Sequence, residues 1–201
     1  MIAILDYDAG NIKSVGKAFE RLGAKVMVTR DYAEIQKADR VVLPGVGSFG
    51  DAMNHLKSYE LDKVIYELVD KKVPFLGICL GLQLLFESSE ESPDVGGLGI
   101  LKGSIKKIPK EEGLKIPHIG WNDLTLTNEG RLFRDLPQHP YVYFVHSYYL
   151  EAEDKQIVKA TTDYGVNIHA SVEHENVFAC QFHPEKSSDV GLTILKNFMN
   201  V

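Results

Sequence analysis

The chain has few cysteines, no excess of basic residues and no long apolar segment. Only two of its 201 residues are cysteines, Cys79 and Cys180, whereas a fold held together by disulfides normally carries more. The formal net charge of −6 leaves no surplus of lysine and arginine to displace counterions from nucleic acid or an anionic membrane. No apolar run approaches the roughly 20 residues of a membrane helix. We therefore expect neither nucleic acid nor a membrane as a partner.

The beginning of the chain and its composition predict one cytoplasmic domain. Residues 1–6 lack the basic start and extended apolar core of a secretory signal, so we expect a cytoplasmic protein with reduced thiols. A composition of 44% apolar and 25% charged residues is ordinary for a folded protein. No linker or change of composition marks a boundary, so we predict a single domain over residues 1–201.

The first half of the chain alternates short apolar runs with repeats of helical spacing. Strands are predicted at 2–5, 25–29, 40–43 and 73–78, and helices at 12–22, 48–57, 60–72 and 80–86. In the second half, strands are predicted at 104–108, 118–127, 141–150, 157–162, 167–173 and 177–182, and a last helix at 189–199. The βαβα rhythm predicts an α/β fold with a parallel sheet and helices on both faces. Several later strands are expected to pair antiparallel at one edge.

The segment Gly77-Ile78-Cys79-Leu80-Gly81 lies where the fourth predicted strand ends and a helix begins. This is the setting of a nucleophile elbow, with cysteine in place of serine. The turn is tight, so glycines are needed two residues before and after the cysteine. The start of the helix directs N–H groups and a positive dipole end at the sulfur, which favours the nucleophilic thiolate. The alternative is a buried structural cysteine between two packing glycines.

His183-Pro184-Glu185 follows the apolar strand predicted at 177–182. In an extended chain, residues i and i+2 point to the same face, and Pro184 keeps His183 out of a helix. Glu185 can then accept a hydrogen bond from one ring nitrogen of His183, while the other nitrogen faces the thiol of Cys79. This is the relation of base and orienting acid in a catalytic triad. The alternative for His183 is a surface or capping role.

Pro44-Gly45-Val46-Gly47 follows the third predicted strand and is expected at the same sheet edge as Cys79. A glycine-flanked peptide there can turn an N–H toward a developing oxyanion, and the amide of Leu80 is the natural second donor. The alternatives are a plain strand-to-helix turn or a phosphate loop. The absence of a following Lys-Ser/Thr pair argues against phosphate.

The remaining cysteine, histidines and tryptophan carry weaker signals. Cys180 alternates with Phe178 and Phe182, which is typical of a strand core. No paired ligand spacing supports a metal site, so no metal is expected. Most of the other six histidines are expected at the surface. Trp121, the single tryptophan, suits either the core or an interface.

Residues 77–83 and 181–185 together are similar to the motifs of class I, or triad, glutamine amidotransferases. Further segments resemble the glutaminase-subunit family of imidazole glycerol phosphate synthases, namely residues 6–11, 44–50, 117–122, 143–148 and 183–187. The resemblance runs essentially from end to end. It implies a flavodoxin-like class I glutamine amidotransferase fold, with a central mostly parallel sheet, helices on both faces and an antiparallel extension in the C-terminal half.

The resemblance also implies a role for each matching residue. Cys79 would attack the amide carbon of glutamine to give a glutamyl thioester, His183 would carry the thiol proton to the leaving ammonia, and Glu185 would orient His183. The residues that would hold glutamine are Gly47, Gln83, Ser147 and Tyr148. The residues that match positions near the partner interface are Asn11, Trp121, Tyr143 and Lys186.

The partner that the resemblance implies is a cyclase subunit, a (β/α)8 barrel, in a heterodimer. The barrel would receive the ammonia and make imidazole glycerol phosphate and an aminoimidazole carboxamide ribotide in histidine biosynthesis. No cofactor is expected. Three alternatives remain open: an amidotransferase that serves another acceptor enzyme, a free-standing cysteine hydrolase, and a binding subunit without catalysis.

The sequence departs from the general amidotransferase pattern at the segment 44–47. Most triad enzymes carry Gly-Gly-Pro there, whereas this chain has Pro-Gly-Val-Gly, as in the glutaminase subunits named above. We hypothesise that the Gly45–Val46 or Val46–Gly47 peptide must flip to complete the oxyanion hole with Leu80, and that partner binding favours the flip. A second departure, Ile119 in place of methionine, is a swap of similar volume.

Overall fold

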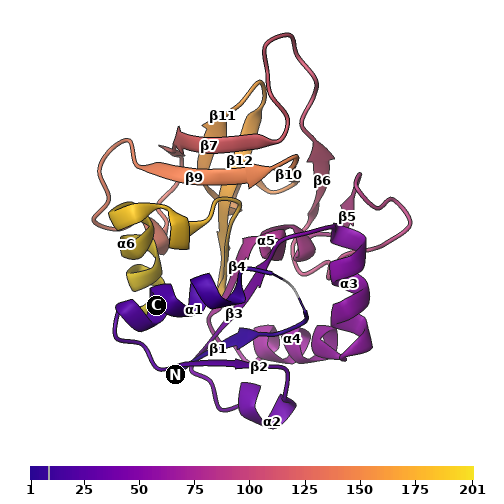
Figure 1. Ribbon diagram of the computed structural model, residues 1–201, viewed down its shortest axis with the longest axis vertical. Helices are drawn as coiled ribbons and strands as arrows, with labels where there is room; N and C mark the ends of the chain where they lie inside the picture. The colour runs from indigo at the N-terminus through magenta and orange to yellow at the C-terminus, as the bar shows by residue number, and fades with distance from the viewer. Residues whose placement is uncertain (9) are drawn as a thin grey trace.

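In residues 1–8 and 10–201, which the computed structural model describes, an eight-stranded sheet runs through the centre of the molecule (Figure 1). Ala9, part of the segment 6–11 quoted above, lies outside the described residues. The strand order is β2-β1-β3-β4-β13-β12-β11-β8. The strands are β1 (Ile2–Leu5), β2 (Val26–Thr29), β3 (Arg40–Gly45), β4 (Phe75–Cys79), β8 (Thr125–Leu126), β11 (Val158–Asp163), β12 (Asn167–His174) and β13 (Val177–Cys180).

The sheet is parallel in one part and antiparallel in the other. Each neighbouring pair from β2 to β13 is parallel, and each pair from β13 outward to β8 is antiparallel. The predicted mostly parallel sheet with an antiparallel extension in the C-terminal half is therefore confirmed.

The inner strands are buried on both faces, which explains their near-continuous apolar sequences. In β1, Ala3 and Leu5 belong to one hydrophobic core, whereas Ile2 and Ile4 belong to the other. Successive side chains of a strand point to opposite faces, so a strand between two layers of helices must be apolar at every position.

Helices cover both faces of the sheet, as predicted. The helices are α1 (Ile12–Arg21), α2 (Tyr32–Ile35), α3 (Phe49–Ser58), α4 (Leu61–Asp70), α5 (Leu80–Leu84) and α6 (Ser188–Met199), with 3-10 turns η1 (Arg131–Phe133), η2 (Lys155–Ile157) and η3 (Pro184–Lys186). One core holds apolar side chains of α1 and α6, where the rings of Phe19 and Phe198 lie 6.2 Å apart. The other core holds those of α3, α4 and α5 (Figure 1). None of the helices in the described ranges has the length and apolar character that crossing a bilayer requires.

The ends of the helices follow from their capping residues. Gly23, with φ of 85°, follows Leu22, the C-cap residue of α1, and ends the helix because glycine adopts this left-handed conformation without strain. The side chain of Ser48 accepts a hydrogen bond from the amide of Asp51 at the start of α3. The short α2 was not predicted, because a single turn is too brief to show a helical repeat.

Two predicted strands are each divided between two sheets. The segment 118–127 forms β7 (His118–Asp123) and β8, and the segment 141–150 forms β9 (Tyr141–His146) and part of β10 (Tyr148–Ala152). β7 pairs with β9, while β10 joins β6 (Gly103–Lys107) and β5 (Ser88–Ser89). The single strand predicted at 141–150 is therefore wrong. Phe144 packs in one core and Leu150 in the other, so the chain must change layers, and it does so at Ser147.

Helix α5 lies so close to β3 that no side chain fits between their backbones. A Cβ atom on Gly81 would lie 1.8 Å from the carbonyl oxygen of Leu43. One on Gly77 would lie 2.7 Å from the carbonyl oxygen of Gly81. Both glycines are therefore required, as the tight turn around Cys79 predicted, and this contact sets the position of Cys79.

We expect Gly81→Ala to lower the free energy of unfolding by roughly 3 kcal/mol or more, because its methyl group meets backbone that cannot move aside. Gly16→Ala is the matched control. Gly16 lies inside α1, where a Cβ would meet only ordinary contacts at 3.6 and 3.8 Å, so its effect should stay within about 1 kcal/mol. Urea unfolding of both variants measures the difference, and equal stabilities would contradict the close-packing argument.

Candidate active site

Three strand ends meet at the carboxyl edge of the sheet beside Cys79. β3 pairs with β4 as far as Gly45, which lies opposite Cys79. β13 pairs with β4 as far as Cys180, which lies opposite Ile78. The chain then continues past this edge to His183. Because parallel strands end at the same edge of a sheet, residues about a hundred positions apart become neighbours.

Cys79 occupies the sharp turn between β4 and α5. Its φ of 55° and ψ of −107° lie outside the regions that residues with side chains ordinarily adopt. The residue is almost completely buried, and its Sγ lies 3.8 Å from the carbonyl oxygen of Val145. The strand, turn and helix expected around the cysteine are thus present, with the sulfur at the edge of the sheet.

His183 and Glu185 form a buried pair beside this sulfur. Nδ1 of His183 lies 2.8 Å from Oε1 of Glu185, and both side chains are almost fully buried. His183 is extended, but Pro184 begins the turn η3, so Glu185 reaches the ring around a turn. The strand β13 ends at Cys180, two residues earlier than predicted. The expected contact is therefore present, although the extended geometry from which it was inferred ends at His183.

The surroundings of His183 hold a proton on its ring. Burial by itself lowers the pKa of His183, but the hydrogen bonds and charges of Cys79 and Glu185 outweigh burial and raise this pKa to about 10. The charged imidazole is the state that stabilises a thiolate next to it. His183 thus supplies a positive charge next to the sulfur. This charge adds to the positive dipole end of α5, which is a helix of only five residues.

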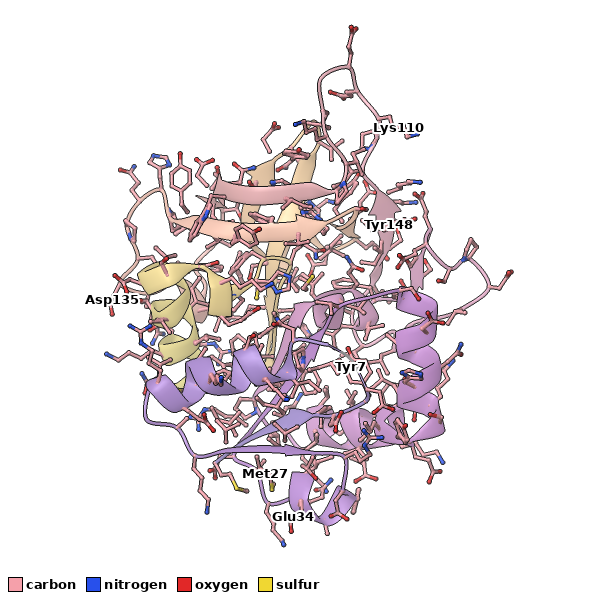
Figure 2. All side chains as sticks on the ribbon, in the orientation of Figure 1. Tyr7, Met27, Glu34, Lys110, Asp135 and Tyr148 are labelled. Carbon is pink, nitrogen blue, oxygen red and sulfur yellow. The ribbon has the colours of Figure 1, made fainter. Side chains whose placement is uncertain are left out.

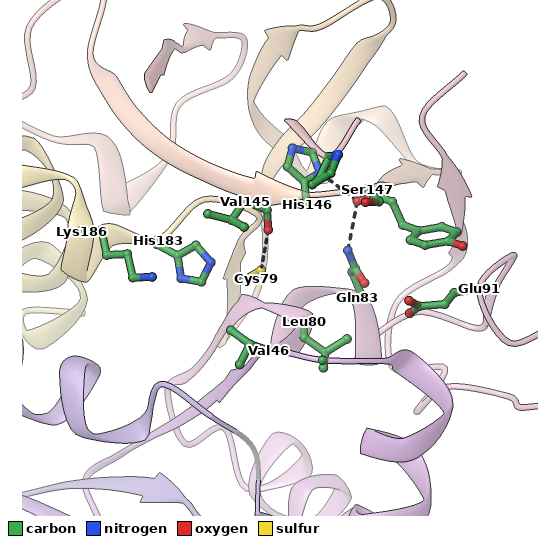
Figure 3. A pocket seen from close by; sticks show the side chains of 13 residues that line it. Val46, Cys79, Leu80, Gln83, Glu91, Val145, His146, Ser147, His183 and Lys186 are labelled. Atoms are coloured by element: carbon green, nitrogen blue, oxygen red, sulfur yellow. Dashed lines mark hydrogen bonds between the residues drawn. The ribbon is translucent and has the colours of Figure 1, made fainter. Parts of the chain in front are cut away.

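A cavity of about 320 Å³ opens beside Cys79 and His183 (Figure 3). Every residue expected to contact glutamine lines this cavity, and so do the three candidates for the oxyanion hole: Val46, Gly47, Leu80, Gln83, Ser147 and Tyr148. Glu91 also lines it, and one of its oxygens accepts a hydrogen bond from the amide of Phe49. The sequence gives no sign of this role for Glu91, because the residue lies in a turn with no motif, in a segment rich in glutamates.

Two buried glutamines connect the sulfur to the far wall of the cavity. Nε2 of Gln83 donates to the carbonyl oxygen of Tyr148 at 3.1 Å and to Oε1 of Gln181 at 3.0 Å. Gln181 in turn directs its Nε2 at the Sγ of Cys79, 3.6 Å away. The sequence predicted Gln83 as a substrate ligand but assigned no role to Gln181. The position of Gln181 next to Cys79 depends on the pairing of β13 with β4.

The segment 44–47 borders the nucleophile from the other side. Pro44 and Gly45 still belong to β3, which is two residues longer than predicted. Val46 is 42% exposed, and Gly47 has a φ of 111° that favours glycine. The peptide between them therefore leaves the paired part of the strand next to Cys79.

The residues expected at a partner interface lie in three places. Trp121 and Tyr143 form a cross-strand pair of β7 and β9, with an edge-to-face contact of 5.9 Å. Trp121 is 52% exposed and lies beside the exposed Ile119, so this face of the small sheet presents apolar surface. Lys186 lines the cavity. Asn11 is half-buried, and its Nδ2 donates to Oε1 of Glu185.

Three histidines outside the triad are buried: His118, His146 and His169. The expectation that most of these histidines lie at the surface is therefore wrong. Nδ1 of His146 lies 2.9 Å from the carbonyl oxygen of Tyr148 and must donate to it. Nε2 of His146 then accepts from Nδ1 of His118, 2.9 Å away. His118 is also stacked between Phe144 and Tyr164. Cys180, by contrast, is a core residue as predicted.

Comparison with known proteins shows the family and the fold of the chain. The family described as glutamine amidotransferase class-I matches residues 3–201. The chain is similar to a crystal structure of a glutamine amidotransferase, with a TM-score of 0.76 at 19% identity over 98% of both chains. It is also similar to the structure of PurLQS from Thermotoga maritima, with a TM-score of 0.74 at 20% identity over 99% of this chain and 97% of the other. At these identities, the structural likeness shows the fold alone.

The chain belongs to the class I glutamine amidotransferases and, among them, to the family of imidazole glycerol phosphate synthase subunits HisH. It is 52% identical to subunit HisH of Thermosynechococcus vestitus over 98% of this chain and 95% of that protein. It is 48% identical to the Bacillus subtilis subunit over 98% and 95% of the two chains. For the Aquifex aeolicus subunit, the identity is 50% over 97% and 94%.

We expect Gln181→Leu to slow the alkylation of Cys79 by iodoacetamide three- to tenfold at neutral pH. The substitution removes the hydrogen bond from the amide to the sulfur, which stabilises a negative charge there by about 1 kcal/mol. Ser171→Ala is the control, because the hydroxyl of Ser171 bonds to Ala179 instead. An unchanged rate in the Gln181 variant, or an equal loss in both variants, would contradict this role.

Acid is expected to destabilise the fold through His118 and His146. Burial lowers the pKa of His118 to about 4 and the pKa of His146 to about 3. Between the ordinary value near 6.5 and these values, the unfolded chain binds protons that the folded chain does not. The free energy of unfolding therefore falls as the pH falls through this window.

Urea unfolding between pH 7.5 and pH 4.5 measures this dependence. The double variant His118→Gln/His146→Gln should show a weaker decline toward acid than the unmodified chain. His139→Gln, at an exposed position, is the control and should keep the full decline. A parallel decline in all three proteins would show that the buried pair does not carry the effect.

Proposed function

We propose that this chain is the glutaminase subunit of an imidazole glycerol phosphate synthase and hydrolyses the side-chain amide of glutamine with Cys79, His183 and Glu185. The observation that carries the proposal is the strained cysteine at the sheet edge, beside a buried His–Glu pair and a cavity of suitable size. We propose further that residues 1–201 act as a single glutamine amidotransferase domain.

In the proposed first step, the thiolate of Cys79 attacks the side-chain amide carbon of glutamine. The attack forms an S–C bond. The C–N bond of the amide then breaks, and protonated His183 gives its proton to the leaving nitrogen. Ammonia and a glutamyl thioester result. Glu185 keeps one ring nitrogen of His183 engaged, so that the other nitrogen faces the reacting atoms.

In the second step, His183 takes a proton from water as the water oxygen attacks the thioester carbon. The S–C bond breaks, glutamate leaves and the thiolate of Cys79 is restored. Both steps pass through a tetrahedral oxyanion. The proposed donors to it are the amide of Leu80 and one amide of the segment 44–47, from Val46 or Gly47.

The polar walls of the cavity suit the rest of glutamine. Gly47, Gln83, Ser147 and Tyr148 are the proposed contacts for the bound amino acid. The carboxylate of Glu91 gives the cavity a negative charge that can pair with the α-ammonium group. No step in this scheme needs a cofactor or a metal ion.

The proposed partner is the cyclase subunit, a (β/α)8 barrel that takes up the ammonia inside a heterodimer. The exposed apolar face of β7 and β9, with Trp121 and Tyr143, supports a protein partner at this side of the cavity. Asn11 and Lys186 complete the proposed contact. The cytoplasm remains the predicted location.

We expect the chain alone to release little glutamate from glutamine, and to become active when the cyclase subunit and its phosphoribulosyl-formimino aminoimidazole carboxamide nucleotide are added. The physical reason is the oxyanion hole, which the peptide before or after Val46 completes only after it flips. A coupled assay for glutamate measures the rate in each mixture.

Cys79→Ala is the control and should abolish the activity in every mixture. Full activity of the isolated chain would contradict partner control and favour a free-standing hydrolase. No activity with the liganded partner would contradict the proposed subunit and leave a binding protein without catalysis.

A further inference from the structure

A buried tyrosine hydroxyl forms a hydrogen bond with the segment 44–47. Tyr7 is completely buried and lies in the interior of the molecule (Figure 2). Its hydroxyl donates a hydrogen bond to the carbonyl oxygen of Pro44 at 2.7 Å. Proline has no backbone N–H, so this carbonyl is the only backbone group through which Pro44 can form a hydrogen bond.

The sheet itself leaves this position without a neighbour on one side. β1 pairs with β3 only as far as Val42, whereas β4 pairs with β3 as far as Gly45. The last residues of β3 therefore extend beyond the end of β1. The side chain of Tyr7, two residues after β1 ends, occupies this place and supplies a donor where the backbone ladder has stopped.

The same hydroxyl also lies against the backbone of the next residue. A Cβ atom on Gly45 would lie 2.1 Å from the oxygen of Tyr7 and 3.2 Å from Cβ of Leu80. Gly45 is thus confined between the tyrosine and the helix that begins after Cys79. The first peptide of the segment that lies wholly beyond β3 and this contact is the one between Val46 and Gly47.

Tyr7 is itself fixed by surrounding elements. Its carbonyl oxygen accepts a hydrogen bond from Nδ1 of His55 in α3 at 3.1 Å. The carboxylate of Asp8, the next residue, accepts hydrogen bonds from Arg30 at 2.6 Å and from the hydroxyl of Tyr59. Burial, together with the charge of Cys79, raises the pKa of Tyr7 well above its usual value, so the hydroxyl keeps its proton.

We propose that the Tyr7 hydroxyl is a positioning group for the oxyanion hole, because it fixes Pro44 and Gly45 while the Val46–Gly47 peptide turns. This inference rests on the proposed glutaminase function. Tyr7 does not contact glutamine in this scheme and acts only through the segment 44–47. Without the hydroxyl, the base of the segment can shift, and the N–H that should meet the oxyanion loses its fixed direction.

The test is Tyr7→Phe, which keeps the ring and removes only the donor. In the complex with the cyclase subunit and its nucleotide, kcat for glutamate release should fall about tenfold, with KM for glutamine unchanged. Alkylation of Cys79 by iodoacetamide should keep its rate, because displacement of iodide forms no oxyanion. Thermal unfolding of the variant verifies that it is folded under assay conditions.

The control is Tyr66→Phe, which removes a hydrogen bond of the same kind to the carbonyl oxygen of Leu98, also at 2.7 Å. Its kcat should equal that of the unmodified complex. A Tyr7 variant with full kcat, with a loss confined to KM, or with an equal loss in alkylation would overturn the proposal. An unmodified complex that releases no glutamate would instead refute the proposed function.

Discussion

The close approach of α5 to β3 is the contact on which the rest of the site depends. Gly81 lies against the carbonyl oxygen of Leu43 with no room for a methyl group. The helix can therefore begin directly after the strand only if Cys79 takes a positive φ. That turn lifts the sulfur to the edge of the sheet, where a parallel register brings Gly45 opposite it and His183 beside it. Packing on both sides thus maintains the backbone strain at Cys79.

Two residues of the loop between β1 and α1 contact the two halves of the proposed catalytic arrangement. At its start, the hydroxyl of Tyr7 bonds to Pro44, below the proposed oxyanion hole. At its end, the side chain of Asn11 bonds to Glu185, behind the histidine. A partner that contacts this loop therefore touches the supports of the acid and of the segment 44–47 at once. If the proposed partner contacts this loop, the hydrogen bonds of Tyr7 and Asn11 connect that contact directly to the segment 44–47 and to Glu185.

Local patterns were sufficient to place Cys79 at a turn between a strand and a helix and to predict the α/β class of the fold. The glycines around Cys79 are needed because a side chain there would clash with nearby backbone atoms. The βαβα alternation reflects burial on both faces of a parallel sheet. The same patterns failed where one apolar run serves two layers. Residues 118–127 and 141–150 look like continuous strands, since nothing local states that Phe144 and Leu150 belong to different cores. The break between β9 and β10 falls at Ser147, and this residue lines the cavity.

The sequence by itself determined the class of fold, the cysteine, its histidine and glutamate, and the family. Each of these features can be recognised from residues that are close together in the sequence or from a short sequence motif. The tertiary structure alone decided that Gln181 faces the sulfur, that Glu91 enters the cavity, and that Tyr7 supports the segment 44–47. These contacts join residues far apart in the chain, and their formation depends on strand register and layer packing, which no local periodicity encodes.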